Sequence, residues 1–327
     1  MMRTLHIDTD SFEIAGGFTI SRGSKTHADV LTVRITQGHQ SGRGECVPYA
    51  RYGETIESVT AQIEALRADI ERGLSRKELQ GVMPAGAARN AVDCALWDLE
   101  AKYSGTPVFQ KAGIGQLAPQ TTAFTISVGT PDSMAEATRA AAGRPLLKVK
   151  LAGPGDDDRI EAVRRNAPNA TLIADANEAW DDSCFDTNMA ACHRAGVALI
   201  EQPLPAGEDH KLAEIDHLVP VCADESLHTS HDLEHLRDRY DAVNIKLDKA
   251  GGLTEALVMQ ENARRLGFQV MIGCMVGSSL AMAPAFMIAQ NADYVDLDGP
   301  LLLTRDRKPG LKFEGSLLCP PEAELWG

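Results

Sequence analysis

Between residues 121 and 297 the chain alternates short apolar runs with longer stretches in which apolar and polar positions have helical spacing. Short apolar runs bounded by turn residues are typical of buried parallel strands, and the stretches between them supply the crossover helices that such strands need. Eight strands with seven helices between them predict a closed α/β barrel. The predicted strands are 122–128, 146–151, 171–175, 197–201, 220–224, 242–247, 269–274 and 293–297.

The helices between these strands have their own boundary markers. Thr130 before Pro131 is typical of a helix start, and Gly143, Gly196 and Gly267 lie where helices should end. A doubly wound open sheet is the alternative architecture, but such a sheet gathers its functional residues at one switch point. Polar residues follow many successive strands here, which favours the barrel.

The first 110 or so residues have a different order, with strands first and helices afterwards. Alternating positions predict strands at 3–14 and 28–36, and helical spacing predicts helices that begin after Thr55 and near Ala85. This order is typical of an α+β unit. Two of its loops could close over a site, namely 20–25, which carries Arg22, and 45–54.

We therefore expect three parts in the chain. An α+β capping domain occupies 1–115, and a barrel domain occupies 116–300. Residues 299–327 contain four prolines and have no clear period. We expect the C-terminal segment, 301–327, to run back over the capping domain and to belong to it.

Composition narrows the functional classes. The chain has 327 residues, of which 44% are hydrophobic, and a formal net charge of −14 without an acidic tail or a basic stripe. Nucleic acids and anionic membranes are therefore poor partners. We expect neither a signal peptide nor a membrane-spanning segment. The cysteines are scattered and odd in number, seven in all, which indicates a reduced, cytoplasmic compartment.

Three of the predicted strands end on an acid: Asp175, Glu201 and Asp224. Because the carboxyl ends of neighbouring parallel strands meet at one mouth, these carboxylates should lie together, where they would repel one another without a cation. A hard divalent ion that prefers oxygen ligands, such as Mg²⁺, fits this set. For each acid alone, the alternative is that it caps the helix after its strand.

Lysines flank these acids in strand order. Lys148 and Lys150 share one face of a strand, and Lys246 ends the sixth predicted strand, roughly across the barrel from Lys150. A Lys-x-Lys strand is often only an edge or a solvated strand, but here the next strand ends in Asp175. A lysine serves as a base when nearby positive charge lowers its pKa, and Lys148 and a divalent ion would provide that charge for Lys150.

Two bases around a metal-bound carboxylate suit one kind of reaction. Removal of a proton next to a carboxylate requires that the charge of the resulting enediolate be stabilised, and Mg²⁺ on the carboxylate oxygens provides this. If one lysine removes the proton from one side and the other returns it from the opposite side, the configuration of the carbon is inverted. The residues therefore predict a racemase or an epimerase.

The same residues resemble the muconate-lactonizing subgroup of the enolase superfamily and, within it, the dipeptide epimerases. The resemblance rests on the three lysines, the three acids, Asp296-Leu297-Asp298-Gly299, and the segments 18–24, 48–54, 84–90 and 272–275. It implies a modified TIM-type (β/α)7β barrel with an α+β capping domain, and one Mg²⁺ per subunit. The implied activity is epimerisation of L-Ala-D/L-Glu, a dipeptide of murein metabolism, by a two-base 1,1-proton transfer.

Substrate contacts are expected from both parts of the chain. Asp296 and Asp298 share a strand face and suit the free ammonium of a dipeptide, which is the role that the resemblance implies. Arg22 offers a fork for a second carboxylate, such as that of a glutamyl side chain. Further predicted substrate contacts are Thr125, Cys274 and Met275.

Two more polar residues are predicted to orient the catalytic groups. Asn177 would orient a ligand acid, and Asp248 would orient Lys246. For Asn177 and Asp248, as for Thr125, buried structural polarity is the stronger alternative.

Other functions remain open at this point. The same proton abstraction serves N-acylamino acid racemases, o-succinylbenzoate synthases and cycloisomerases, although their substrates have no free ammonium for Asp296 and Asp298. A catalytically silent binding protein on the same scaffold is the alternative from a different class. The sequence also leaves open whether the protein forms a homo-oligomer.

Overall fold

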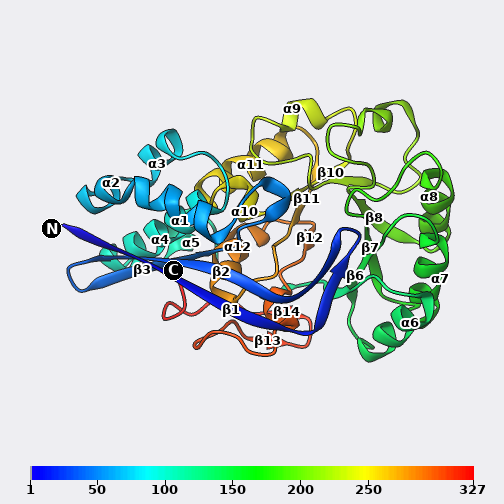
Figure 1. Ribbon diagram of the computed structural model, residues 1–327, viewed down its shortest axis with the longest axis horizontal. Helices are drawn as coiled ribbons and strands as arrows, with labels where there is room; N and C mark the ends of the chain where they lie inside the picture. The colour runs from blue at the N-terminus through cyan, green and yellow to red at the C-terminus, as the bar shows by residue number, and fades with distance from the viewer. Residues whose placement is uncertain (1) are drawn as a thin grey trace.

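Eight parallel strands form one sheet, in the right-hand part of Figure 1. The structure is a computed structural model and describes residues 2–327. All eight predicted barrel strands are present, and each lies next to its neighbour in the chain. The strands are β5 (Phe124–Ile126), β6 (Leu146–Lys150), β7 (Thr171–Asp175), β8 (Val197–Glu201), β9 (Val221–Ala223), β10 (Ala242–Ile245), β11 (Gln269–Ile272) and β12 (Tyr294–Val295).

The first and last strands of this sheet meet. The Ala123 amide donates a hydrogen bond to the Val295 carbonyl at 2.8 Å, and the Leu297 amide donates to the Thr122 hydroxyl at 2.9 Å. These bonds close the sheet, so the prediction of a barrel rather than an open doubly wound sheet is confirmed.

Helices connect most of the barrel strands on the outside. Thr130 caps the first of them, with its hydroxyl 3.2 Å from the Ser133 amide. Gly196 and Gly267 follow helix ends with φ of 62° and 91°, the left-handed conformation that commonly terminates helices. The helices are α6 (Pro131–Ala140), α7 (Asp156–Asn166), α8 (Phe185–Arg194), α9 (Leu233–Leu236), α10 (Leu247–Ala250), α11 (Leu253–Arg265) and α12 (Ser279–Ala289).

The prediction of a helix in every connection is wrong between β8 and β9. That connection contains only the short 3-10 helix η2 (His210–Glu214). Pro203 and Pro205 lie in its first part, and proline lacks the amide donor that a helix interior requires. The chain therefore crosses from β8 to β9 mainly as a loop.

An antiparallel sheet and four helices form the capping unit, which we define as residues 3–104. Its first helix begins as predicted, because Thr55 and Ser58 form a reciprocal capping box. The long helix α4 is buried along most of its length. The elements are β1 (Arg3–Ile20), β2 (Gly23–Gln37), β3 (Gln40–Cys46), η1 (Ala50–Tyr52), α1 (Ile56–Ala65), α2 (Arg67–Arg72), α3 (Arg76–Val82) and α4 (Ala87–Ser104).

The sequence pattern underestimated the sheet of the capping unit. Strands β1 and β2 continue well past the predicted 3–14 and 28–36, and residues 20–25, predicted to be a loop, form the tip of a long hairpin. Most residues near the tip are at least partly exposed on both faces, so the alternation that marks a half-buried strand is absent there. Figure 1 shows this hairpin in dark blue, running from the capping unit to the ends of β6 and β7.

Strand β3 was missed because two of its positions are glycines. A Cβ at Gly44 would lie 2.2 Å from the Ala91 carbonyl oxygen, and a Cβ at Gly42 would lie 2.2 Å from that of Ala95. The sheet and helix α4 therefore touch backbone to backbone, and side chains at these positions would push them apart.

The last part of the chain passes back over the capping unit. Arg307 lies 2.6 Å from the Glu45 carboxylate and 3.0 Å from that of Asp10, and the Trp326 indole donates to the Cys94 carbonyl of α4 at 3.1 Å.

No helix within residues 2–327 combines the length and the apolar character that crossing a membrane requires. The remaining elements are α5 (Val108–Lys111), β4 (Gln120–Thr121), η3 (Gly299–Leu302), β13 (Phe313–Glu314) and β14 (Leu317–Leu318).

Candidate active site

Three buried carboxylates lie at the carboxyl end of the barrel strands. Asp175 and Glu201 are the last residues of β7 and β8 and are register partners in the parallel ladder. Asp224 directly follows β9. All three residues are at most 1% exposed. Buried charges at this density must be compensated by nearby cationic groups.

The two lysines of β6 compensate part of this charge. Lys148 Nζ lies 2.7 Å from Glu201 Oε2 and 3.0 Å from Asp175 Oδ2. Lys150 Nζ donates to Asp175 Oδ2 at 2.5 Å. Both lysines therefore point toward the same mouth as the acids, as expected for residues two positions apart on one strand.

Lys246 and Lys249 compensate the third acid, Asp224, and Asn244 binds Glu201; neither Lys249 nor Asn244 was predicted from the sequence. Lys246 Nζ donates to Asp224 Oδ2 at 2.6 Å. Lys249 Nζ donates to the second oxygen, Asp224 Oδ1, also at 2.6 Å, and Asn244 Nδ2 donates to Glu201 Oε1 at 2.7 Å. Asn244 is two positions before Lys246 and therefore shares its strand face, so the sequence could have indicated that Asn244 lies at the site. No sequence pattern distinguishes Lys249, which lies on α10.

These contacts shift the pKa values of Lys148 and Lys246. Burial alone would lower the pKa of Lys148, but the surrounding carboxylates, first that of Asp296, hold it well above its usual value. Burial also disfavours the charge of Lys246, yet Asp224 raises that pKa well above its usual value. A base needs a lowered pKa instead, so a cation that engages these carboxylates would shift Lys246 toward its neutral form.

The donor chemistry of the three acids fits a hard divalent cation. All the donors are carboxylate oxygens, which Mg²⁺ prefers. Burial and the charge of Asp175 raise the pKa of Glu201 to about 7, so the lysines do not fully compensate the charge around Glu201. With the present side-chain positions, no three acidic, histidine or cysteine groups in residues 2–327 enclose an ion. Lysine ammonium groups face the oxygens that an ion would take.

Asp296 and Asp298, the predicted ammonium ligands, are buried and already paired. Lys148 Nζ donates to Asp296 Oδ2 at 2.8 Å, and the backbone amide of Thr125 donates to Asp298 Oδ2 at 2.7 Å. Burial and the charge of Asp296 raise the pKa of Asp298 to about 7. One acceptor is left over, because Asp296 Oδ1 has no hydrogen-bond partner within residues 2–327.

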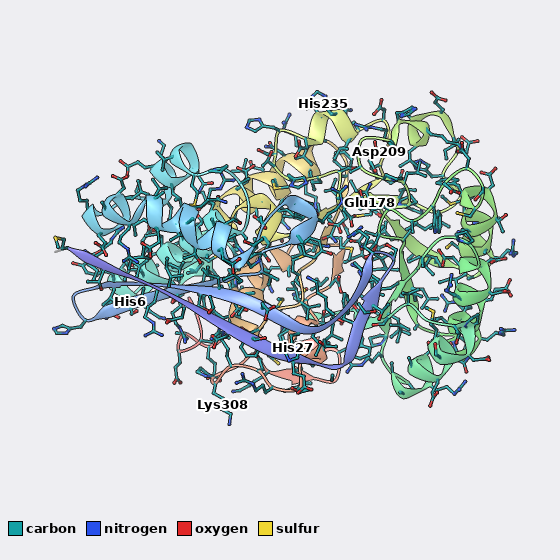
Figure 2. The ribbon with its side chains drawn as sticks, viewed as in Figure 1. His6, His27, Glu178, Asp209, His235 and Lys308 are labelled. Atoms are coloured by element: carbon teal, nitrogen blue, oxygen red, sulfur yellow. The ribbon has the colours of Figure 1, made fainter. Side chains whose placement is uncertain are left out.

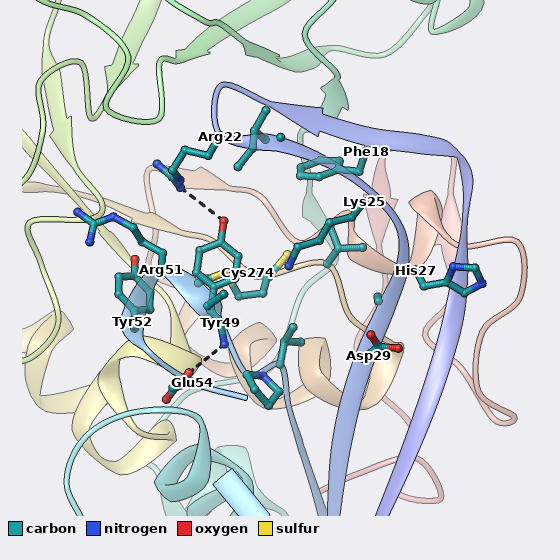
Figure 3. Close-up of a pocket in the computed structure, with 18 of the residues that line it drawn as sticks. Phe18, Arg22, Lys25, His27, Asp29, Tyr49, Arg51, Tyr52, Glu54 and Cys274 are labelled. Carbon is teal, nitrogen blue, oxygen red and sulfur yellow. Dashed lines mark hydrogen bonds between the residues drawn. The ribbon is translucent and has the colours of Figure 1, made fainter. Parts of the chain in front are cut away.

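A cleft of about 890 Å³ lies between the mouth of the barrel and the capping unit (Figure 3). Its capping side is formed by the β1–β2 hairpin and by residues 47–56. The two loops predicted to cover a site thus border one cleft together with residues at or just after the ends of β6, β9, β10 and β11. From the barrel, the lining includes Lys150, Asp224, Lys246, Cys274 and Met275.

Arg22, at the tip of the hairpin, points into this region, and its guanidinium is paired with two acids. Nη2 lies 2.7 Å from Glu225 Oε1, and Nη1 lies 3.0 Å from Glu178 Oε2. Nη2 also lies 3.4 Å from the Tyr49 hydroxyl (Figure 3). Neither Glu178 nor Glu225 was predicted from the sequence, although each closely follows a predicted metal ligand in the chain.

Glu178 also binds the second capping loop. Arg51 forms two parallel hydrogen bonds to its carboxylate, at 2.9 and 2.8 Å, and the Ala206 amide donates to it at 2.9 Å. Its backbone has φ of 68°, a conformation that is unfavourable for residues with a side chain. Glu178 (labelled in Figure 2) therefore joins both capping loops to the barrel.

The two predicted orienting residues make different contacts from those expected. Asn177 does bind the carboxylate of Asp175, but through its backbone amide, 3.0 Å from Oδ1. Asp248 Oδ1 accepts hydrogen bonds from the Val47 amide at 3.1 Å and from Asn90 Nδ2 at 2.8 Å. These partners replace the lysine that Asp248 was predicted to orient, so its carboxylate joins the barrel to the capping unit.

Models of known families match both parts of this arrangement. Residues 2–113 match the N-terminal domain of mandelate racemase / muconate lactonizing enzyme, and residues 132–320 match the enolase C-terminal domain-like family. A barrel with acids and lysines at its strand ends, under a separate capping unit, thus defines an enolase-type protein. More narrowly, the chain belongs to the mandelate racemase/muconate lactonizing enzyme family of the enolase superfamily.

Two characterised relatives match nearly the whole chain. L-Ala-D/L-Glu epimerase of Escherichia coli (strain K12) is 45% identical over 314 residues, which cover 95% of this chain and 98% of that protein. N-acetyl-D-glutamate racemase of Pseudoalteromonas sp is 47% identical over 303 residues, which cover 91% of this chain and 95% of that protein.

Solved structures give the same result. An enolase family member from Agrobacterium tumefaciens, described as homologous to dipeptide epimerases and as containing sodium and L-Ala-L-Glu, has a TM-score of 0.98 at 57% identity, covering 99% of this chain and 100% of that one. A dipeptide epimerase from Cytophaga hutchinsonii, in complex with Mg and D-Ala-L-Val, has a TM-score of 0.91 at 27% identity, covering 98% and 94%. The resemblance drawn from the sequence is confirmed.

Proposed function

We infer that this chain is a Mg²⁺-dependent dipeptide epimerase that inverts the α-carbon of the C-terminal residue in L-Ala-D/L-Glu. One structural observation carries the proposal: Lys150 and Lys246 line the same cleft from opposite walls of the barrel. Strands β6 and β10 are separated by three strands in either direction around the closed sheet of eight. The similarity to L-Ala-D/L-Glu epimerase over 95% of the chain supports the substrate.

The two lysines would exchange roles between the two directions of the reaction. The lysine in its neutral form removes the α-proton from one face, and the ammonium on the opposite wall donates a proton to the other face, which inverts the configuration. Lys148 is not part of the cleft lining. Its ammonium, bound to Glu201 and Asp296, orients these acids and adds positive charge beside Lys150.

Asp175, Glu201 and Asp224 would hold the Mg²⁺. When bound, the ion supplies Lewis-acid stabilisation of the negative charge that develops on the substrate carboxylate. The dipeptide epimerase of Cytophaga hutchinsonii, whose structure contains Mg, supports this assignment.

The remaining predicted residues would hold the two ends of the dipeptide. Arg22 suits the glutamyl side chain because its guanidinium can bind a carboxylate through two parallel hydrogen bonds. The free acceptor Asp296 Oδ1 suits the ammonium of the first residue. In this binding mode Arg22 exchanges a contact with Glu225 for one with the substrate.

Racemisation of N-acetyl-glutamate is the second candidate, and one observation favours it. Neither Asp296 nor Asp298 is part of the cleft lining, and each is paired with a group of the chain. An N-acetylated substrate has no ammonium and needs no carboxylate partner. The relative from Pseudoalteromonas, an N-acetyl-D-glutamate racemase, supports this candidate as well.

Isotope exchange separates the two candidates. The protein would be incubated in D₂O with Mg²⁺ and, in separate reactions, L-Ala-L-Glu, L-Ala-D-Glu and N-acetyl-D-glutamate, followed by mass spectrometry and chiral chromatography. We expect deuterium and inversion in both dipeptides, and no activity after chelation until Mg²⁺ is added back. A higher kcat/KM for N-acetyl-D-glutamate would establish the second candidate, and absence of label in every substrate would reject both.

A further inference from the structure

Gln202 directly follows the ligand acid Glu201 and is fully buried. Its backbone has φ of 36°, in the left-handed region that residues with a side chain rarely adopt. Such a conformation persists only where the surrounding contacts impose it, and these residues concentrate at functional sites. The tertiary contacts of Gln202 must therefore impose this conformation.

Strand pairing alone does not position Asp224. The ladder between β8 and β9 ends with Glu201 opposite Cys222, and β9 itself ends at Ala223. Asp175 and Glu201, by contrast, are direct register partners. The main chain of Asp224 thus lies beyond the hydrogen bonds that align the other two ligand acids, and something else must hold it.

The side chain of Gln202 holds the amide of Asp224, while the Asp224 carbonyl accepts from Lys249 Nζ and from the Leu227 amide. Gln202 Oε1 accepts from the Asp224 amide at 2.8 Å and from the Ser226 amide at 3.1 Å, and the Gln202 backbone amide donates to the Cys222 carbonyl at 2.9 Å. Backbone amides can only donate, so this pair of contacts fixes the oxygen end of the carboxamide. One residue therefore connects the end of β8 to the main chain on both sides of β9's last residue.

A buried polar network holds the nitrogen end. Gln202 Nε2 lies 2.9 Å from Ser226 Oγ and 2.9 Å from the Tyr240 hydroxyl. Both hydroxyls donate to Asp209 Oδ2 at 2.6 Å, which leaves their oxygens to accept from Gln202. Arg239 completes the network through a 2.6 Å ion pair with Asp209 (labelled in Figure 2). The carboxamide is thus held at both ends.

We propose that Gln202 is a positioning residue for the divalent-cation site, which fixes the main chain of Asp224 relative to Glu201 so that both carboxylates serve one ion. The proposal rests on the proposed function for the cation and extends it to a residue that binds neither the ion nor the substrate. Loss of a residue that orients metal ligands commonly weakens metal binding about 10- to 100-fold.

The test compares Gln202→Leu with Gln260→Leu in the metal-stripped full-length protein. Gln260 is also a buried amide, but its Nε2 donates to the Ile288 carbonyl at 2.7 Å, between α11 and α12. Isothermal titration with Mg²⁺ should give a Kd about 10- to 100-fold higher for Gln202→Leu and an unchanged Kd for Gln260→Leu. At saturating Mg²⁺, Gln202→Leu should recover most of the wild-type kcat.

Tyr240→Phe is a milder change in the same network. If Gln202→Leu does not fold, this variant tests whether the network affects Mg²⁺ binding. It removes the hydrogen bonds that the Tyr240 hydroxyl accepts from Gln202 Nε2 and donates to Asp209 Oδ2 but leaves Gln202 itself in place, so we expect a Kd for Mg²⁺ raised roughly fivefold. An unchanged Kd in these variants, with only a lowered melting temperature, would show that Gln202 is structural and would overturn the inference. A wild-type protein that binds no Mg²⁺ would instead overturn the proposed function.

Discussion

The barrel side and the capping side of the cleft hold their side chains in different ways. On the barrel side, the three acids and three predicted lysines lie on the barrel strands or directly after them and are at most 6% exposed. On the capping side, Arg22 and Arg51 extend from a hairpin tip and a loop, with side chains 27% and 39% exposed. Under the proposed function, the buried barrel side would carry the chemistry, whereas the more exposed capping side would allow substrate selection to change. Relatives with different named substrates, an L-Ala-D/L-Glu epimerase and an N-acetyl-D-glutamate racemase, match the chain at similar identities of 45% and 47%.

Loss of a barrel lysine should have the largest effect. Lys150→Met and Lys246→Met should each lower the kcat of epimerisation at least ~10³-fold, since general acid–base catalysis contributes typically 10²–10⁴-fold and each lysine is needed in both directions. A chiral assay of both dipeptides measures this loss. Lys77→Met, on the exposed surface of α3, should behave as wild type, and a rate near wild type in either active-site variant would contradict the two-base assignment.

Release of the capping side should affect substrate binding more than chemistry. Glu178→Ala removes the carboxylate that pairs with Arg22 and Arg51, and charged hydrogen bonds of this kind contribute about 1.5–3 kcal/mol. We expect KM to rise about tenfold with little change in kcat, and trypsin to cleave the hairpin tip faster.

Glu64→Ala is the matched control for that experiment. It removes an exposed ion pair with Arg67 in the same unit, so KM and proteolysis should not change. If Glu178→Ala gave the same result as this control, the ion pairs of Glu178 would not hold the capping loops.

A change at Asp248, whose carboxylate joins the barrel to the capping unit, should give the smallest effect. Burial raises the pKa of Asp248 to about 7, whereas an unfolded aspartate titrates near 3.9. The folded state therefore holds the proton more tightly, and this stabilisation is complete below about pH 4 and is lost as the pH rises to 7. As the pH rises from about 4 to 7, the melting temperature of wild type should fall relative to that of Asp248→Asn. The expected fall is about 2–4 °C for each kcal/mol of folding stability lost. A constant difference across this range would show that Asp248 stays ionised.

The barrel half of the site could be predicted because its geometry follows from strand order. An acid at the end of each of three neighbouring strands has to reach the same mouth, and lysines two positions apart have to share a face. Asp175, Glu201, Lys148 and Lys150 accordingly contact one another in the structure. The spacing of the apolar runs is therefore enough to predict that these acids and lysines lie together.

The other residues of the site are placed by tertiary contacts, which the spacing of apolar and polar residues along the chain does not reveal. Gln202 and Glu178 adopt left-handed backbone conformations that arise from tertiary contacts and not from local sequence preference. Lys249 reaches Asp224 from a helix, and Asp248 turned out to face the capping unit. The hairpin tip was mistaken for a loop because a strand exposed on both faces shows no alternation.

The symmetric position of β6 and β10 around the barrel has a consequence for metabolism under the proposed reaction. A site with an amine on each side of the carbon can start from either configuration, and like any catalyst it cannot alter the equilibrium constant. The final proportion of the two diastereomers is therefore a property of the dipeptides in water. Net flow toward one of them must come from a later step that consumes it, such as hydrolysis by a stereoselective peptidase.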